Sequence, residues 1–276
     1  MNAVSVLRAV NAAAGSVTPD LSAQVAKHLL LHAQPHSRGA WELPVAKSAT
    51  RITFRFGLSG LRWGEEGPAV LVMHGWEGRP TQFRHFVEPL LAAGRQVIAL
   101  DAPANGASSG SEATLMEVAM SLLEAAVEIR SLDAVIGHSL GAAAVAIALA
   151  QGLPAERAVL IASPSRIEDS LHGFAGVLGL PRRASERLGE LMGISARELE
   201  ITQQVSGLKI PALIVHDRDD TAVPFVEGQA IANAWPGARL LPTEGLGHWR
   251  VLTDSHVTHQ VAAFLTNSER VHDLKH

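Results

Sequence analysis

Ser139 stands at the centre of a short glycine-flanked segment: residues 137–141 read Gly-His-Ser-Leu-Gly and fit the pattern G-x-S-x-G. A serine hydroxyl attacks a carbonyl carbon once a neighbouring base takes its proton. The pattern serves that chemistry when it forms a sharp turn between a strand and a helix, which exposes the serine oxygen. The turn is so tight that flanking side chains would collide, which explains glycine on both sides. Ser139 is therefore a candidate nucleophile.

The segments on either side of Ser139 have the character that such a turn requires. Residues 134–136 form an apolar run typical of a buried strand, and an Ala-rich helix is predicted over residues 142–150. The N-terminal end of that helix would favour negative charge developing at the site. The pentapeptide alone is a weak signal, because a glycine-lined turn with Ser139 as a helix cap fits it as well. The flanking strand and helix favour the nucleophile.

The strand–serine–helix arrangement resembles the α/β-hydrolase superfamily, and the resemblance covers about residues 51–266. It implies an α/β-hydrolase fold, with a mostly parallel central sheet, helices on both faces and a helical cap insert. It also implies a catalytic triad in the chain order nucleophile, acid, histidine.

The resemblance places the acid in a turn after a late strand. Three carboxylates, Asp217, Asp219 and Asp220, follow the apolar run 212–215. The family has its acid three residues before a Val-Pro pair, and Asp220 fits that spacing. Asp217 stands where the family often has glycine, so we expect it to shape the turn or its hydrogen bonding. The alternative for all three is a solvated acidic turn.

The resemblance places the base in a loop before the last helix. Thirteen histidines are present, so residue type alone identifies nothing. His248 follows glycine at the expected place and is predicted to take the proton of Ser139, while Asp220 orients its ring. His28 and His32 stand four residues apart on a predicted helix. Without a metalloprotease motif around them, they are interpreted as an exposed helix face.

An oxyanion formed on the attacked carbonyl needs two hydrogen-bond donors. The resemblance implies the backbone N–H groups of Leu140, which follows the nucleophile, and of Trp76, in a His-Gly loop after an early strand. His74, which opens that loop, is expected to be structural. The loop 101–110 resembles a family loop that organises the site without doing chemistry.

The elements that would carry these residues are short apolar runs separated by helical segments. Such runs are typical of parallel strands buried on both faces, and their alternation with helices predicts a sheet covered on both sides. Runs occur at 69–73, 96–100, 134–136, 158–162, 212–215 and, more weakly, 239–241, after a predicted hairpin at 51–56 and 58–63. Helices are predicted at about 81–93, 112–130, 140–151, 226–235 and 250–267.

Residues 1–276 are interpreted as a single domain with two additions. A peripheral helical extension occupies residues 1–45, and an insert at about 163–208, with helical pieces at 181–192 and 196–205, separates two strands. We expect the insert to cap the active site, with Phe174 and Leu178 beside Trp249 at an apolar acyl site. The alternative is that its apolar residues only pack it onto the sheet.

Composition narrows the function classes. The 276 residues include 47% hydrophobic and 18% charged residues, enough for a sizeable core. A net charge of -4 without basic clusters argues against a nucleic-acid partner. The lack of cysteine excludes disulfides and thiolate catalysis. We interpret the N-terminus as an amphipathic helix rather than a signal peptide and expect a cytoplasmic protein with no membrane span.

The sequence as a whole predicts a carboxylesterase-like serine hydrolase acting on a small ester-like molecule through an acyl-enzyme on Ser139. It implies no cofactor and no metal, and it leaves the oligomeric state open. Thioester, carbon–carbon or acyl-transfer chemistry can use the same triad. The alternative to an enzyme is a ligand receptor or interaction protein that retains the fold.

Overall fold

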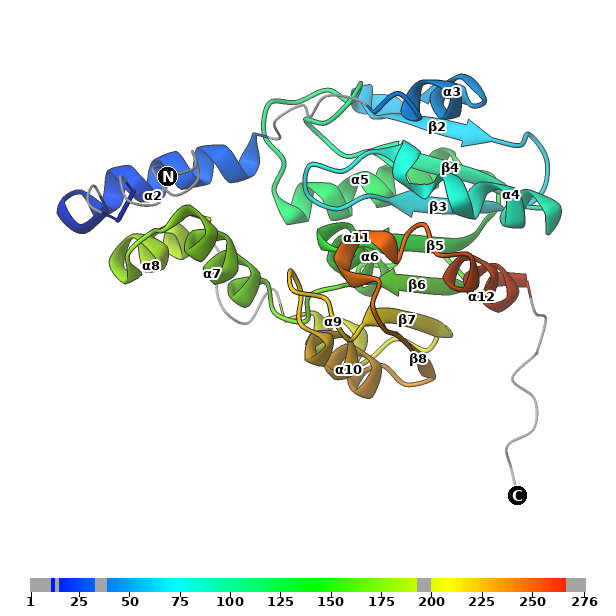
Figure 1. Cartoon of the computed structure of the whole chain (residues 1–276). Coiled ribbons are helices and arrows are strands. Elements are labelled where there is room, and N and C mark those ends of the chain that lie inside the picture. Colours follow the sequence, from blue (N-terminus) through cyan, green and yellow to red (C-terminus); the bar gives the residue numbers. More distant parts are fainter. Residues whose placement is uncertain (1–10, 13–14, 33–38, 193–199, 267–276) are drawn as a thin grey trace.

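The computed structural model describes residues 11–12, 15–32, 39–192 and 200–266. Within these ranges the strands form one eight-stranded sheet in the order β1-β2-β4-β3-β5-β6-β7-β8 (Figure 1). The strands are β1 (Thr50–Thr53), β2 (Ser59–Trp63), β3 (Ala69–Met73), β4 (Gln96–Asp101), β5 (Leu132–His138), β6 (Arg157–Ile161), β7 (Ala212–Asp217) and β8 (Ala238–Thr243).

The apolar runs of the sequence are the strands of this sheet. From β4 to β8 neighbouring strands are parallel, whereas β1–β2 and β2–β4 are antiparallel. This arrangement confirms the predicted mostly parallel sheet. The first predicted strand was too long: β1 ends at Thr53, and Arg55–Gly57 form a short 3-10 turn. The chain turns there because Phe56 adopts a left-handed φ of 58° and leaves its side chain exposed.

Helices cover both faces of the sheet. One face carries α5 (Leu115–Glu128), α6 (Leu140–Ala150), α9 (Ile201–Val205) and α10 (Phe225–Ala234). The opposite face carries α3 (Glu42–Lys47), α4 (Arg84–Ala92) and α12 (Ser255–Thr266). The last predicted helix is divided into α11 (Gly247–Arg250) and α12. Asp254 precedes α12, and its side chain accepts a hydrogen bond from the backbone N–H of Val257 at 3.0 Å. That side-chain bond caps α12 and separates it from the loop of His248.

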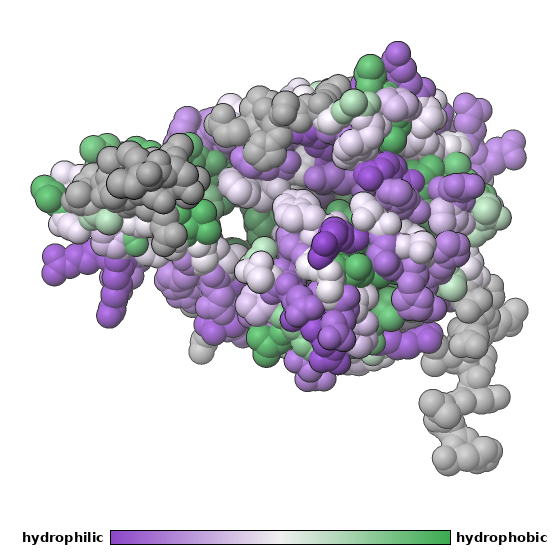
Figure 2. All heavy atoms as spheres, in the orientation of Figure 1, coloured by the Kyte–Doolittle hydropathy of each residue, from purple (hydrophilic) through white to green (hydrophobic). Residues whose placement is uncertain are grey.

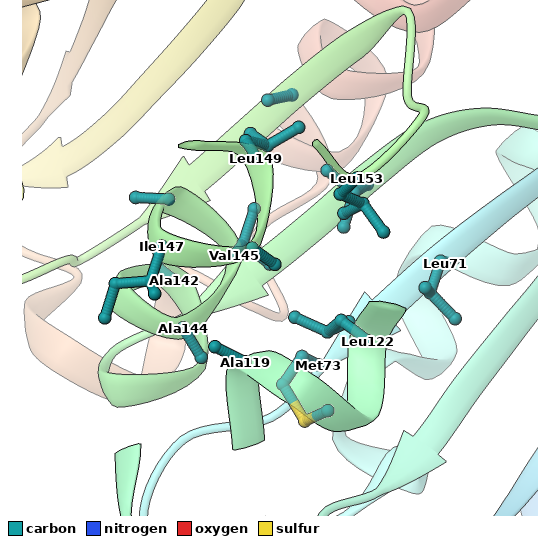
Figure 3. Close-up of a cluster of buried hydrophobic side chains, with 14 of the residues drawn as sticks. Leu71, Met73, Ala119, Leu122, Ala142, Ala144, Val145, Ile147, Leu149 and Leu153 are labelled. Carbon is teal, nitrogen blue, oxygen red and sulfur yellow. The ribbon is translucent and has the colours of Figure 1, made fainter. Parts of the chain in front are cut away.

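The helix that follows Ser139 lies in the centre of the molecule. Nearly every residue of α6 is buried, because α5 and α9 pack against it on the side away from the sheet. An α-helix that is apolar all round requires such surroundings. Its side chains meet Leu71 and Met73 of β3 and Leu122 of α5 (Figure 3). Burying each leucine-sized side chain stabilises the fold by roughly 1.5–3 kcal/mol, so the turn at Ser139 is attached to a firmly packed helix.

A separate group of helices stands beside the sheet. It consists of α2 (Pro19–Leu31), α7 (Ile167–Leu178) and α8 (Arg182–Leu191), and we call it the helical lobe (Figure 1). Ala23 and Ala26 of α2 are buried against Leu188 of α8. Helix α2 of the predicted N-terminal extension therefore completes the apolar packing of the insert. The space-filling view shows the surface hollowed between the lobe and the rest of the molecule (Figure 2).

The insert divides into two parts. Its helices α7 and α8 belong to the lobe, whereas α9 packs against α6 and α10 over the sheet. The predicted helix at 196–205 lies partly outside the described residues, and its described part is α9. At the start of the insert, the backbone N–H and hydroxyl of Ser165 both bond to Glu227 of α10, at 2.7 and 2.5 Å. These bonds fix the insert where it leaves β6.

Across the described residues, every helix is too short or too polar to cross a membrane.

Candidate active site

Ser139 occupies a strained turn between β5 and α6. Its φ of 55° is left-handed, a conformation that non-glycine residues rarely adopt. Both flanking glycines are required: a Cβ on Gly137 would lie 2.5 Å from Ala142 Cα, and one on Gly141 would lie 2.2 Å from His74 O. The tight turn directs the Ser139 hydroxyl away from the sheet and toward the loop that carries His248.

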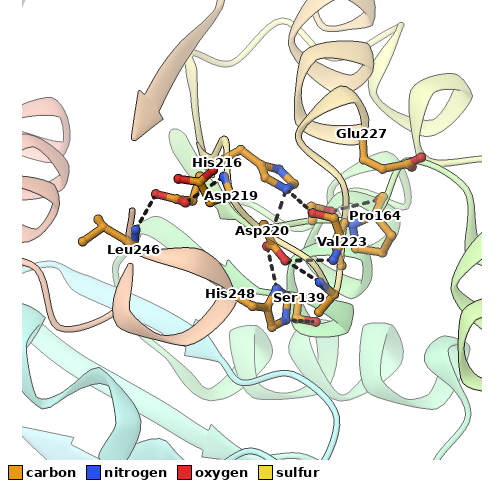
Figure 4. A network of polar contacts seen from close by, with 12 residues as sticks. Ser139, Pro164, His216, Asp219, Asp220, Val223, Glu227, Leu246 and His248 are labelled. Carbon is orange, nitrogen blue, oxygen red and sulfur yellow. Dashed lines mark hydrogen bonds and ion pairs between the residues drawn. The ribbon is translucent and has the colours of Figure 1, made fainter. Parts of the chain in front are cut away.

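Three side chains predicted from distant parts of the sequence meet at this turn (Figure 4). His248 Nε2 lies 3.0 Å from Ser139 Oγ, and His248 Nδ1 lies 2.7 Å from Asp220 Oδ2. Because a carboxylate only accepts, Nδ1 donates to Asp220 and leaves Nε2 free to accept from the serine hydroxyl. Within the described part of the chain, these contacts are the ones that the sequence analysis predicts for a nucleophile, a base and an orienting acid.

Asp220 is held as a carboxylate although it is buried. Burial alone would raise its pKa, but hydrogen bonds from His248 and the backbone N–H of Val223, with those from Ala222, outweigh burial and lower the pKa of Asp220. Its second oxygen accepts from Ala222 N at 2.8 Å and Val223 N at 2.9 Å. The negative charge that would stabilise a protonated His248 is therefore present at neutral pH.

Two further buried histidines support this arrangement, and sequence reasoning missed both. His138 Nε2 donates to the backbone carbonyl of His248 at 2.9 Å, and His216 Nε2 donates to that of Val223 at 2.9 Å. Burial, together with the nearby His248, lowers the pKa of His138 to about 3. Burial also lowers the pKa of His216. Both rings are neutral donors that hold the backbone beside His248 and Asp220.

The loop after β3 runs directly beside Ser139. A Cβ on Gly75 would lie 2.8 Å from Ser139 Cβ and 3.4 Å from Ser139 Oγ, so only glycine fits. His74 Nδ1 donates to the carbonyl of Gly75 at 2.8 Å, while its Nε2 accepts from Ala102 N at 3.1 Å. Because burial lowers the pKa of His74, its ring is neutral and joins this loop to the end of β4.

Trp76, the next residue of that loop, contacts the helical lobe through its side chain. The indole N–H donates to the carbonyl of Leu30 in α2 at 3.0 Å, and the indole meets the ring of Phe174 in α7 edge-on at 5.4 Å. Its backbone N–H, the predicted oxyanion donor, follows Gly75 in the chain. Leu140, the other predicted donor, is the first residue of α6, where N–H groups have no partner within the helix.

The remaining predicted pocket residues have different surroundings. Trp249 is 50% exposed, and its ring stands edge-on to that of His248 at 5.1 Å. Leu178 packs against the apolar cluster of Ala23, Ala26 and Leu188 inside the lobe. Phe174 touches the same cluster but also reaches Trp76. Leu178 thus packs inside the lobe, whereas Trp249 meets the ring of His248 and Phe174 meets that of Trp76.

Among the described residues, the hydrogen bonds of the loop 101–110 do not reach Ser139, Asp220 or His248. Asp101 accepts from Ala107 N at 3.2 Å, and Ser108 bridges from Asp101 O at 2.6 Å to the backbone N–H of Ser59 at 2.9 Å. These bonds join the end of β4 to β2. The loop supports the strand end that His74 also contacts.

Comparison with known proteins identifies the family. Residues 69–264 match the model of the alpha/beta hydrolase family, so the chain belongs to that family. A search of curated proteins found no match. Helix α2, which completes the helical lobe, lies outside the matched residues.

Solved structures share the fold at low identity. An esterase from Pyrococcus furiosus is 20% identical with a TM-score of 0.66, over 85% of this chain and 97% of that chain. An esterase from Exiguobacterium antarcticum is 18% identical with a TM-score of 0.61, over 79% of this chain and 99% of that chain. A bromoperoxidase from Bacillus anthracis is 18% identical with a TM-score of 0.62, over 78% of this chain and 99% of that chain. These likenesses define the fold of the chain as that of an α/β hydrolase.

Proposed function

We propose that this protein is a serine hydrolase that cleaves a carboxylic ester, or a closely related acyl bond, of a small molecule. The observation that carries the proposal is the placement of His248 between Ser139 Oγ, at 3.0 Å, and Asp220 Oδ2, at 2.7 Å. Such a constellation is recognised by its geometry and roles rather than by sequence position.

In the proposed reaction, Ser139 Oγ attacks the carbonyl carbon as its proton passes to His248 Nε2. Asp220 stabilises the imidazolium that forms and keeps the ring in the correct tautomer. His248 then gives the proton to the leaving alcohol, and the acyl group remains on Ser139. Water attacks this acyl-enzyme with His248 again acting as base, which releases the acid and restores the serine.

We assign the oxyanion hole to the backbone N–H groups of Leu140 and Trp76. The first residue of a helix has an N–H group with no partner within the helix, and α6 begins at Leu140. The N-terminal end of α6 also favours the negative charge of the tetrahedral intermediate. Trp76 follows Gly75, whose α-carbon lies close to the nucleophile, so the loop is near enough to supply the second donor.

We assign an apolar acyl or alcohol group to the substrate. Trp249, 50% exposed, stands edge-on to the ring of the proposed base, and Trp76, 37% exposed, follows Gly75, which lies beside Ser139. Phe174 extends the surface of Trp76 toward the lobe. Large aromatic side chains of this kind bind apolar groups by burying area without a polar partner.

A series of p-nitrophenyl esters of increasing chain length tests the proposal, together with a fluorophosphonate probe that labels activated serines. We expect hydrolysis and labelling by the wild type. Ser139→Ala should abolish labelling and reduce turnover on the order of a millionfold, with an unchanged melting temperature. If the wild type neither reacts with the probe nor hydrolyses any ester, the protein is not a serine esterase, and a binding function within the same fold would replace it.

A further inference from the structure

The turn that begins at the last residue of β7 carries a second carboxylate, which is more deeply buried than the acid of the proposed triad. Asp217 is 1% exposed, compared with 6% for Asp220. An unpaired carboxylate is costly to bury, so its hydrogen-bond partners reveal what the residue does. Sequence reasoning assigned Asp217 only a part in shaping the turn, at a position where the family often has glycine.

The partners of Asp217 lie on the loop that leads to His248. Asp217 Oδ2 accepts from Leu246 N at 3.0 Å and from Thr243 Oγ1 at 2.7 Å. Burial alone would raise the pKa of Asp217, but the bonds from Thr243 and from the backbone N–H of Gly247, with those from Leu246 and Asp219, lower it. Asp217 is thus a carboxylate that ties β8 and the two residues before His248 to the end of β7.

The loop that leads to His248 needs these hydrogen bonds because its backbone conformation is unusual. Gly245 and Gly247 have left-handed φ values of 75° and 64°, so they give the chain the greatest freedom just before the base. His248 must nevertheless keep two hydrogen bonds at once, one to Asp220 and one to Ser139. A glycine-rich loop holds its next side chain in place only when its backbone groups have fixed partners.

We propose that Asp217 is a positioning residue for His248, acting through the backbone of residues 246 and 247. The proposal rests on the proposed function, in which His248 is the base. On the other side, His138 holds the carbonyl of His248 at 2.9 Å, so the backbone of the base is fixed both before and after its own Cα. Asp217 itself touches none of the reacting atoms.

The same turn supplies a matched control. Asp219 also bonds the loop, accepting from Gly245 N at 2.8 Å, but it is exposed and reaches the loop one residue farther from His248. Asp217→Asn and Asp219→Asn each remove one charge from the same turn. If the position of the carboxylate, rather than the charge of the turn, determines the placement of His248, the two variants will differ in kcat.

The test compares both variants for kcat and KM on a reactive ester and for the strongly deshielded proton-NMR signal of the His248 Nδ1–H bonded to Asp220. Asp217→Asn should lower kcat about tenfold to a hundredfold with little change in KM, because a misplacement of about 1 Å is enough for such a loss. It should also weaken or broaden the proton signal. Asp219→Asn should stay within about threefold of the wild type in kcat and keep the signal.

Thr243→Val provides a milder variant if Asp217→Asn does not fold. It removes the hydroxyl that bonds Asp217 Oδ2 and should change kcat and the proton signal in the same direction by a smaller factor. A lower melting temperature with unchanged kcat and an unchanged signal would overturn the proposal, since Asp217 would then be structural only. The NMR signal also separates this outcome from failure of the proposed function, because it reports the position of His248 whether or not esters are cleaved.

Discussion

At the scale of single residues, identical side chains in this site differ because their partners differ. Asp217, Asp219 and Asp220 lie within four positions. Asp217 is buried and bonds the backbone of Leu246, Asp219 is exposed and bonds that of Gly245, and Asp220 bonds the ring of His248. The four histidines near the site divide in the same way. His74, His138 and His216 are neutral donors that hold backbone, whereas His248 alone among them contacts Ser139.

Asp220→Asn tests the assignment of the acid at this scale. Asparagine keeps the size of the side chain but donates toward Nδ1, so His248 would be held in the wrong tautomer. We expect kcat/KM for a reactive ester to fall about ten-thousandfold. Asp219→Asn is the control and should change it only slightly. If Asp219→Asn were the more damaging substitution, the acid would have been assigned one residue too late.

At the scale of elements, the helical lobe combines two segments that are far apart in the sequence. Helix α2 packs against α8 of the insert, and the carbonyl of Leu30 and the ring of Phe174 both contact Trp76. The lobe is therefore attached to the loop that passes the nucleophile as well as to β6. We expect its aromatic side to influence which acyl chain fits and its alanine-rich interior to determine its stability.

Phe174→Ala and Leu178→Ala separate these two effects. Phe174→Ala removes the ring beside Trp76, so kcat/KM should shift toward a different acyl-chain length while short esters still react. Leu178→Ala should leave the preference unchanged and lower the free energy of unfolding by about 1–3 kcal/mol, less than for a fully buried leucine. The measurements are kcat/KM across an ester series and urea unfolding. An equal loss for every ester in Phe174→Ala would show that this residue serves packing only.

At the scale of the whole molecule, buried ionisable groups link stability to pH. The pKa values of His74, His138 and His216 are lowered by burial, to about 3 for His138, so each ring stays neutral to a lower pH in the folded protein than in the unfolded chain. In the unfolded chain they take up protons at about pH 6.5. The unfolded state then binds more protons than the folded state, and stability falls as the pH falls.

Urea unfolding at pH 7.5, 6.5 and 5.5 measures this dependence. Below about pH 6.5, His138 should lower the free energy of unfolding by up to about 1.4 kcal/mol per pH unit, and His74 and His216 should add losses in the same direction. Asp217 and Asp220, whose pKa values are lowered, add a further loss only near and below pH 4. In His138→Gln the dependence between pH 6.5 and 5.5 should be weaker. A constant free energy of unfolding from pH 7.5 to 5.5 would contradict the neutral buried histidines.

The sequence by itself determined the features that depend on neighbouring residues. Short apolar runs became the strands, and the glycines around Ser139 predicted a turn in which no other residue fits. Local patterns succeed here because burial on both faces of a sheet and the close packing of a strand–helix turn restrict residue types position by position. The resemblance of two further motifs to the α/β-hydrolase family likewise indicated Asp220 and His248, which the fold brings to Ser139.

Only the tertiary structure decided which surfaces and polar groups meet across long separations. The bond from His138 to the carbonyl of His248 spans 110 positions, and that from Asp217 to the N–H of Leu246 joins two loops from different strands. The pairing of α2 with α8 was equally hidden in the sequence. Apolar periodicity reveals that a helix has a face to bury but not which partner will cover it, because any apolar surface removes that face from water equally well.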